Sequence, residues 1–259
     1  MSVALHHEAS GREEGPVLVL GSSLGTTGAV WTPQLPAWEP RLRVVRYDHR
    51  GHGGSPAPQG PYALAELAGD VLTLLDRLGI ERASLGGVSL GGMVAMWLAT
   101  HAPERVERLI VCCSAAHLPP ASAWHERAAA VRAAGSVGAV ADAVVKRWTT
   151  PGFRSEHPQI IEGLQAMLVA TAPEGYAACC EAIAGMDLRA ALPGIAAPTL
   201  LIVGKQDLAT PPAHGEAIAS VVPGARLESL SPAAHLAGIE QPDAVADLVL
   251  EHLDPKEPR

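Results

Sequence analysis

The chain has 259 residues, a formal net charge of −8 and 48% hydrophobic residues. This length and apolar content are typical of one α/β domain, and the acidic balance argues against nucleic acid or an anionic membrane surface as a partner. The apolar runs are too short to cross a bilayer and the N-terminus lacks a signal-peptide layout, so we expect a cytoplasmic protein without a membrane partner. Nothing in the sequence predicts the oligomeric state.

Strands and helices alternate along the first half of the chain. Continuous apolar runs predict buried strands at 16–20, 42–47, 82–88 and 106–113. Apolar residues at helical spacing predict helices at 63–78 and 93–101. Strands joined by helices predict a mostly parallel, doubly wound sheet, with ligands binding at the carboxyl ends of the strands.

The alternation lapses between residues 118 and 189. This stretch consists of Ala-rich, helix-like segments separated by prolines, and it predicts an inserted helical cap. Alternation resumes with predicted strands at 199–203 and 226–230 and predicted helices at 213–222 and 243–253. We therefore expect a core formed by residues 1–117 and 190–259 and a cap formed by residues 118–189.

A G-x-S-x-G motif lies between a predicted strand and a predicted helix. It spans Gly87 to Gly91 and places Ser89 at the sharp turn between the two elements. A serine in such a turn needs neighbours without side chains, because the strand and the helix crowd each other there. By itself the motif also fits an idle Gly-rich turn, so its meaning depends on whether a base and an acid accompany it.

Two further residues supply that base and acid. A serine hydroxyl is a poor nucleophile unless a positioned base takes its proton, and in this fold the acid and then the histidine follow the serine along the chain. Asp207 follows the predicted strand at 199–203, and His235 follows the predicted strand at 226–230. Either residue alone is more commonly a turn or core residue. Together with Ser89 they predict a catalytic triad at one edge of the sheet.

Metal and redox sites are not expected. No histidine pair has the spacing of a zinc site, and we expect neither a metal nor a cofactor. The four cysteines form two adjacent pairs, Cys112-Cys113 and Cys179-Cys180, and neighbouring cysteines rarely bridge. We expect reduced, buried thiols.

The chain resembles the α/β-hydrolase superfamily and, within it, the 3-oxoadipate enol-lactonases, over nearly its whole length. The elbow, the late Asp, the late His and the loop D-H-R-G-H-G-G-S are general to the superfamily. The cap segments R-W-T-T-P-G-F-R and P-E-G-Y-A-A-C-C-E-A-I are more specific to the enol-lactonases. Gly86 departs from the pattern, because it gives the elbow strand a second glycine.

The resemblance implies an α/β-hydrolase fold and a lactonase mechanism. Ser89 would attack the carbonyl of a five-membered enol lactone that carries an acetate arm, with His235 as base and Asp207 as its partner. The tetrahedral oxyanion would rest on the backbone N–H groups of Leu90 and Leu24, with Ser23 as the second choice for the latter. Ser22-Ser23 stands where the superfamily often has His-Gly, which leaves the hydrogen bonding of this loop open.

A small anionic lactone needs a cation in the cavity. The cap offers five, which are Arg127, Arg132, Lys146, Arg147 and Arg154. Helical spacing places Trp124, Arg127 and Val131 on one face, so we expect Arg127 to point toward the cleft beside Trp124. Trp148 is expected to wall the cavity and Ser23 to contact the substrate.

Two other interpretations stay open. Another carboxylesterase, another lactonase or a cofactor-free perhydrolase of the same superfamily would share the triad and differ in the cap. A catalytically inactive hydrolase fold used for binding would belong to another functional class, and the intact Ser89, Asp207 and His235 argue against it.

Overall fold

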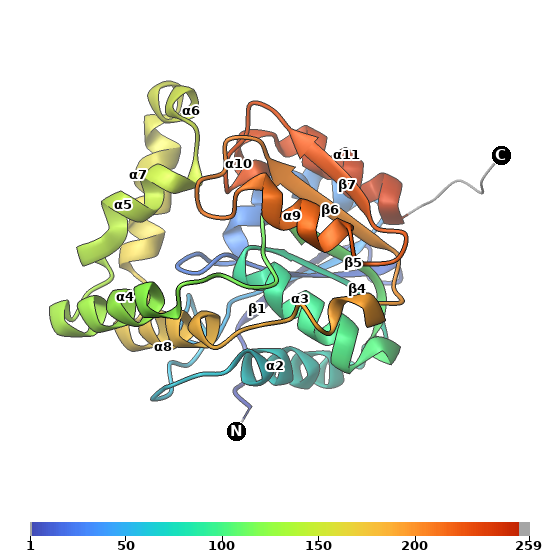
Figure 1. The fold of residues 1–259 in the computed structure, drawn as a ribbon. Helices are drawn as coiled ribbons and strands as arrows, with labels where there is room; N and C mark the ends of the chain where they lie inside the picture. The colour runs from blue at the N-terminus through green and yellow to red at the C-terminus, as the bar shows by residue number, and fades with distance from the viewer. Residues whose placement is uncertain (1, 254–259) are drawn as a thin grey trace.

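The computed structural model describes residues 2–253 and is built around one seven-stranded sheet (Figure 1). The strand order is β1-β3-β2-β4-β5-β6-β7, and only β1 runs antiparallel to its neighbour. The strands are β1 (His7–Gly11), β2 (Val17–Gly21), β3 (Arg43–Tyr47), β4 (Ala83–Val88), β5 (Val106–Cys112), β6 (Thr199–Gly204) and β7 (Arg226–Leu230). The predicted α/β class with a mostly parallel sheet is confirmed.

Helices cover both faces of the sheet (Figure 1). On one face α3 (Leu90–His101) packs on β4 and β5, with α2 (Leu64–Arg77) beside it. On the other, α11 (Pro242–Leu253) packs with the short α1 (Leu35–Trp38). The remaining core helices are α9 (Pro212–Ala219) and α10 (Ala237–Glu240). Helix α3 begins at Leu90, three residues before the predicted start, so Ser89 immediately precedes its first turn.

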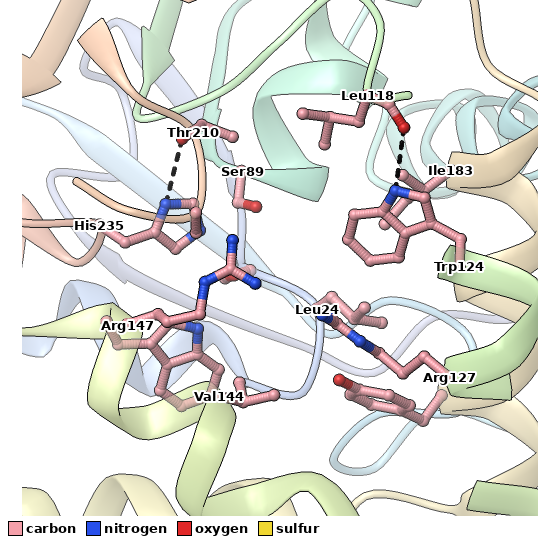
Figure 2. A pocket seen from close by; sticks show the side chains of 14 residues that line it. Leu24, Ser89, Leu118, Trp124, Arg127, Val144, Arg147, Ile183, Thr210 and His235 are labelled. Atoms are coloured by element: carbon pink, nitrogen blue, oxygen red, sulfur yellow. Dashed lines mark hydrogen bonds between the residues drawn. The ribbon is translucent and has the colours of Figure 1, made fainter. Parts of the chain in front are cut away.

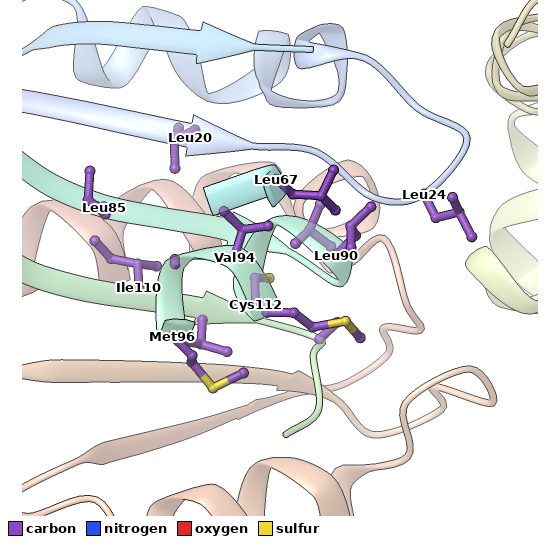
Figure 3. Packing of buried hydrophobic residues seen from close by; sticks show 14 of the residues in the cluster. Leu20, Leu24, Leu67, Leu85, Leu90, Val94, Met96, Ile110 and Cys112 are labelled. Atoms are coloured by element: carbon purple, nitrogen blue, oxygen red, sulfur yellow. The ribbon is translucent and has the colours of Figure 1, made fainter. Parts of the chain in front are cut away.

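The hydrophobic core lies between the central strands and α3 (Figure 3). Leu85 of β4 and Ile110 of β5 pack under Val94 of α3, and all three side chains are at most 2% exposed. Every residue of β4 and β6 is buried, as their continuous apolar runs predicted. Burial of a large apolar side chain contributes about 1.5–3 kcal/mol, so this packing fixes the strand ends that carry the site.

Five helices lie between β5 and β6 and are called the cap helices below. They are α4 (Ala121–Ala134), α5 (Gly138–Trp148), α6 (Pro151–Glu156), α7 (Pro158–Val169) and α8 (Pro173–Ala184). The segments that lead out to them and back lie side by side, since His117 bridges Asp187 and the N–H of Leu188 donates to Ala116 O at 2.8 Å. Figure 1 shows the cap helices as a separate layer beside the sheet.

The cap helices contact the core very closely at one point. A Cβ atom on Gly51, in the loop after β3, would collide with the backbone of Gly175 in α8, and the converse also holds. Gly51 has φ of +77°, a conformation that glycine adopts without strain. Nearby, the N–H of Ala172 donates to Gly51 O at 3.3 Å. The start of α8 therefore rests directly on the main chain of the core loop.

Within residues 2–253, no helix is both long enough and apolar enough to span a membrane.

Candidate active site

One cavity collects the carboxyl ends of the strands under the cap helices (Figure 2). Because the strands are parallel, the segments after β2, β4, β6 and β7 emerge at the same edge of the sheet. The loop after β2 contributes Ser23 and Leu24, the turn after β4 contributes Ser89, and the loop after β7 contributes His235. The cap helices supply most of the opposite wall.

Ser89 occupies a strained backbone conformation. Its φ of 55° and ψ of −115° lie in a region that residues other than glycine rarely adopt. The flanking glycines make this turn possible, because a Cβ on Gly87 would lie 2.5 Å from the carbonyl carbon of Gly91. A Cβ on Gly91 would in turn lie 2.5 Å from the carbonyl carbon of Gly21 in β2. Three glycine backbones thus cross where the predicted elbow lies.

Hydrogen bonds hold the elbow in this conformation. The N–H of Ser89 donates to Cys112 O at 2.9 Å, and the hydroxyl of Ser114 donates to Ser89 O at 2.7 Å. The additional glycine that departs from the family pattern also has a steric cause: a Cβ on Gly86 would lie 2.8 Å from Ile110 O on the neighbouring strand. The elbow strand is therefore too close to β5 for a side chain at this position.

Asp207 is buried and fully engaged. It is 3% exposed, and its Oδ1 accepts from the N–H groups of Ala209 and Thr210 at 2.7 and 2.9 Å. Its Oδ2 accepts from the Thr210 hydroxyl at 2.7 Å and lies 2.8 Å from His235 Nδ1. Burial raises the pKa of Asp207, but the electrostatic attraction to the neighbouring His235 and these hydrogen bonds outweigh it and lower the pKa below its ordinary value.

His235 is oriented by Asp207 and Thr210. Its Nδ1 lies 3.1 Å from Thr210 Oγ1 (Figure 2) and also bonds Asp207 Oδ2. One N–H is thus shared between two acceptors. Thr210 was not identified from the sequence. The signal was available, since a threonine three residues after an aspartate commonly closes a local side-chain turn.

Ser89 and His235 line the same cavity, and Figure 2 shows both side chains turned toward it. Because Nδ1 of the imidazole is bound to Asp207, Nε2 is on the side away from the carboxylate. The described residues form no hydrogen bond with the Ser89 hydroxyl, which is therefore free to take up a reacting group. In resting enzymes such catalytic hydrogen bonds are often long and shorten in the substrate complex.

Two main-chain N–H groups flank the serine. Leu90 is the first residue of α3, so its N–H has no acceptor within the helix and points out of the positive end of the helix dipole. Leu24 lies in the loop after β2, and its N–H donates to no group among residues 2–253. The predicted oxyanion donors are thus both unengaged, and they come from the two strands that adjoin at the elbow.

Two buried histidines hold the loop that carries Leu24. His52 Nε2 accepts from the N–H of Gly25 at 2.8 Å, while His49 Nε2 donates to Ser22 O at 3.0 Å. Burial lowers the pKa of His52 to about 4 and that of His49 to about 3, so both rings are neutral. These rings, with bonds from the side chains of Ser22 and Thr26 within the loop, stand in for the absent His-Gly pair.

The end of α5 and the residues after it are bonded to the segment that carries the imidazole of His235. The N–H of Leu236 donates to Trp148 O at 2.8 Å. Glu240 accepts from the N–H of Thr150 at 2.8 Å with one oxygen and from the N–H of Ala234 at 2.6 Å with the other. His235 therefore lies between Ala234 and Leu236, whose N–H groups are hydrogen-bonded to the cap, the first through Glu240 and the second directly.

The predicted substrate contacts all line the cavity, namely Ser23, Trp124, Arg127 and Trp148. Arg127 lies over the ring of Trp124 at 4.7 Å, and Trp124 donates to Leu118 O at 3.0 Å (Figure 2). Arg147, another of the five candidate cations, also lines the cavity. The sequence did not single out the remaining wall residues from the cap region, which are Leu118, Val144, Tyr176 and Ile183. Their positions depend on how the cap docks, which periodicity does not reveal.

The other three predicted cations, Arg132, Lys146 and Arg154, do not line this cavity. Arg132 pairs with Glu174 at 2.8 Å and Glu181 at 2.5 Å and fastens α4 to α8. Lys146 is exposed, and Arg154 donates to main-chain oxygens of Lys146 and Thr149.

The four thiols are free and buried, and burial raises the pKa of Cys179, among others. In the described part of the chain, no three His, Cys, Asp or Glu side chains are grouped as metal ligands would be.

Comparison with known proteins gives a consistent result. Residues 16–242 match the family described as alpha/beta hydrolase fold. The chain is 41% identical to 3-oxoadipate enol-lactonase 2 of Acinetobacter baylyi over 242 residues, which cover 93% of this chain and 90% of the relative. A crystal structure of the enol-lactonase from Burkholderia xenovorans LB400 matches with a TM-score of 0.94 and 42% identity, covering 97% of this chain and 96% of the other.

A more distant relative is RutD of Stutzerimonas stutzeri, whose name carries a provisional assignment as a carbamate hydrolase. It is 31% identical over 265 residues, covering 96% of both chains. These similarities, together with the elbow, identify an enzyme that hydrolyses esters or lactones. The chain belongs to the α/β-hydrolase superfamily and, within it, to the 3-oxoadipate enol-lactonase family.

Proposed function

We propose that this enzyme opens 3-oxoadipate enol-lactone to 3-oxoadipate, a step in the catabolism of aromatic compounds by the β-ketoadipate pathway. The observation that carries the proposal is the combination of Ser89 on its elbow, the Asp207–His235 pair 2.8 Å apart, and a cavity wall that contains arginine. The triad serves any ester, whereas a cationic wall favours a substrate with a free carboxylate.

The first half of the reaction forms an acyl-enzyme. His235 Nε2 takes the proton of the Ser89 hydroxyl as its oxygen adds to the ring carbonyl, and the N–H groups of Leu24 and Leu90 bind the oxyanion. Collapse breaks the bond between the acyl carbon and the ring oxygen. The departing group is an enolate, whose delocalised charge makes it a better leaving group than an alkoxide, and proton transfer from His235 leads to the ketone.

The second half of the reaction releases the product. A water molecule gives a proton to His235 as it adds to the acyl-serine, and the second tetrahedral oxyanion rests on the same N–H groups. Collapse returns the proton to Ser89 and frees the acid. Throughout, Asp207 holds the Nδ1–H tautomer and balances the imidazolium, a role that suits its lowered pKa.

The cap would supply recognition of the substrate. We assign residues 118–189 to this cap and residues 1–117 and 190–259 to the core, of which residues 1 and 254–259 lie outside the part that the structure describes. In this proposal Arg127 on Trp124 binds the acetate arm, Trp148 forms the wall beside the ring, and Ser23 contacts the substrate near Leu24. We also propose a cytoplasmic location, because four buried free thiols are typical of a reducing compartment.

The test is to supply the enol lactone, or muconolactone with its isomerase, and to follow the loss of the enol-lactone absorbance. We expect hydrolysis that depends on Ser89 and that exceeds the rate for aryl esters and aryl carbamates of similar size. Rapid hydrolysis of the aryl esters or carbamates without acceleration on the lactone would instead indicate another hydrolase of the superfamily. Failure of a fluorophosphonate to label Ser89 would favour a binding protein.

A further inference from the structure

Two guanidinium groups face the cavity without a carboxylate partner. Arg127 and Arg147 both line it, and in the described part of the chain neither forms an ion pair. Arg127 rests on Trp124, while Arg147 donates through one nitrogen to Leu208 O at 2.7 Å. Both side chains are half-buried, and a partly desolvated charge without a counter-ion is costly. Such an arrangement favours an anionic ligand.

The two cations are at different ends of the cavity. Figure 2 shows Arg147 beside His235 and Ser89, and Arg127 across the cavity with Trp124. Leu208, which Arg147 contacts, directly follows Asp207 in the chain. Burial and the repulsion of Arg127 lower the pKa of Arg147, so the groups are close enough to feel each other. An anion at either end relieves this repulsion.

A third group completes the site. Tyr176 lines the same cavity and is 0% exposed, yet its hydroxyl has no partner of regular hydrogen-bond geometry within residues 2–253. Burial raises its pKa strongly even though Arg127 and Arg147 oppose the shift, so it remains a neutral donor. A buried O–H without an acceptor is rare, and a carboxylate bound between the two arginines would provide one.

If the proposed function holds, the negative charges of the substrate and of the product match the two arginines of the cavity. The lactone enters with one carboxylate. Hydrolysis consumes one water, breaks the bond between the acyl carbon and the ring oxygen, and yields a second carboxyl group at Ser89, which ionises and releases one proton. The ligand thus changes from one negative charge to two, and the new charge arises at the end where Arg147 lies.

We propose that Arg147 binds the carboxylate that the reaction creates, while Arg127 and Tyr176 bind the carboxylate that the substrate brings. The cavity is therefore a dicarboxylate site with one cation for each end. Arg147 binds the carboxylate formed at the acyl end and thereby favours dicarboxylates, whereas the N–H groups of Leu24 and Leu90 bind the oxyanion.

The test is calorimetric titration with adipate and with pentanoate, which is adipate with one carboxyl group replaced by hydrogen. Wild-type enzyme is expected to bind adipate about tenfold or more tightly than pentanoate, since a charge-assisted pair adds this much. Arg147→Met should lose that advantage, Arg147→Lys should regain part of it, and pentanoate affinity should change less than about twofold. Lys146→Met is the matched control, because Lys146 is an exposed neighbour on α5 outside the cavity.

A purely structural role for Arg147, through Leu208, makes a different prediction. It would lower the rate at which a neutral fluorophosphonate labels Ser89, and it would weaken both ligands equally. We expect wild-type labelling in Arg147→Met, so slow labelling or equal losses would overturn the proposal, as would unchanged adipate binding. Neither ligand is turned over, so a negative lactonase assay would reject the proposed function and leave this binding result to be judged separately.

Discussion

The sheet side and the cap side of the cavity are built by different means. On the sheet side, main chain does the positioning: Gly21, Gly87 and Gly91 cross where no Cβ fits, and the N–H groups of Leu24 and Leu90 are fixed with them. On the cap side, the wall consists of side chains that project from helices and are held by contacts of their own, such as Arg127 on Trp124 and Arg147 on Leu208 O. The difference indicates that the chemistry is set by backbone geometry and the choice of ligand by replaceable side chains.

The sharpest way to break the sheet side is to remove the nucleophile. Ser89→Ala should lower kcat for an aryl ester on the order of 10³–10⁶-fold while the fold persists, because members of a triad act as a unit. His235→Ala should fall in the same range. Ser220→Ala, exposed just after α9, is a matched serine control and should keep full activity. Comparable activity in Ser89→Ala would place the reaction elsewhere.

One added methyl group should change the free energy of unfolding in opposite directions at a glycine of the elbow and at a glycine of the cap. Gly87→Ala should lose about 3 kcal/mol of unfolding free energy or fail to fold, because backbone surrounds the new Cβ. Gly163→Ala, within α7 and with no atom within 4 Å of the new Cβ, should gain about 0.5–1 kcal/mol. Urea unfolding measures both, and equal effects would contradict the comparison.

The buried histidines make the sheet side sensitive to acid. The pKa of His52 falls from 6.5 to about 4 on folding, so between these values only the unfolded chain binds the proton. The free energy of unfolding is therefore highest above pH 6.5 and decreases as the pH falls toward 4, by on the order of 3 kcal/mol in all for this group. His49 and His252, whose pKa values burial lowers to about 3 and about 4, act in the same direction.

His52→Gln separates this contribution, because an amide oxygen can accept from Gly25 and does not titrate. Thermal unfolding of the variant should depend less steeply on pH between 6 and 4.5, by about 1.4 kcal/mol per pH unit. A variant with the wild-type slope would show that the ring of His52 is not the titrating group.

The smallest effect concerns the orientation of the imidazole. Thr210→Val removes the hydroxyl that bonds Asp207 at 2.7 Å and lies 3.1 Å from His235 Nδ1. We expect kcat to fall about tenfold with KM nearly unchanged, since one hydrogen bond of about 1–1.5 kcal/mol is lost. Thr210→Ser keeps the hydroxyl and should recover most of the rate. A larger effect on KM than on kcat would assign Thr210 to substrate binding instead.

Most strands of the sheet could be predicted from the sequence for a physical reason. Strands buried on both faces are continuous apolar runs, and parallel strands must end at one edge, so Ser89, Asp207 and His235 were predicted to converge before any coordinates. β1 was missed because its sequence His-Glu-Ala-Ser-Gly is polar and only partly buried, as an edge strand can be. The short helices between residues 28 and 38 were also not predicted, since they contain two prolines.

The cap could be predicted only as a set of helices. Which of its residues face the cavity depends on the docking of α4, α5 and α8. Of five cationic side chains, helical spacing in the sequence favoured only Arg127. The structure separates them by their partners: Arg132 is consumed by two glutamates, whereas Arg127 and Arg147 are not. Tyr176 carried no signal, because a tyrosine in an Ala-rich helix is ordinarily a core residue.

Where Gly51 meets Gly175, the main chains of the core loop and of α8 touch with no room for a side chain on either residue. Tyr176 directly follows Gly175 and lines the cavity. A side chain added at either glycine would therefore move the tyrosine hydroxyl away from the arginines. If the cap of a relative replaced this one, it would need a glycine at this position, because a larger residue would push α8 away from the core and enlarge the cavity. One added methyl group at this contact, outside the cavity wall, could therefore change the size of the cavity, both in evolution and in protein engineering.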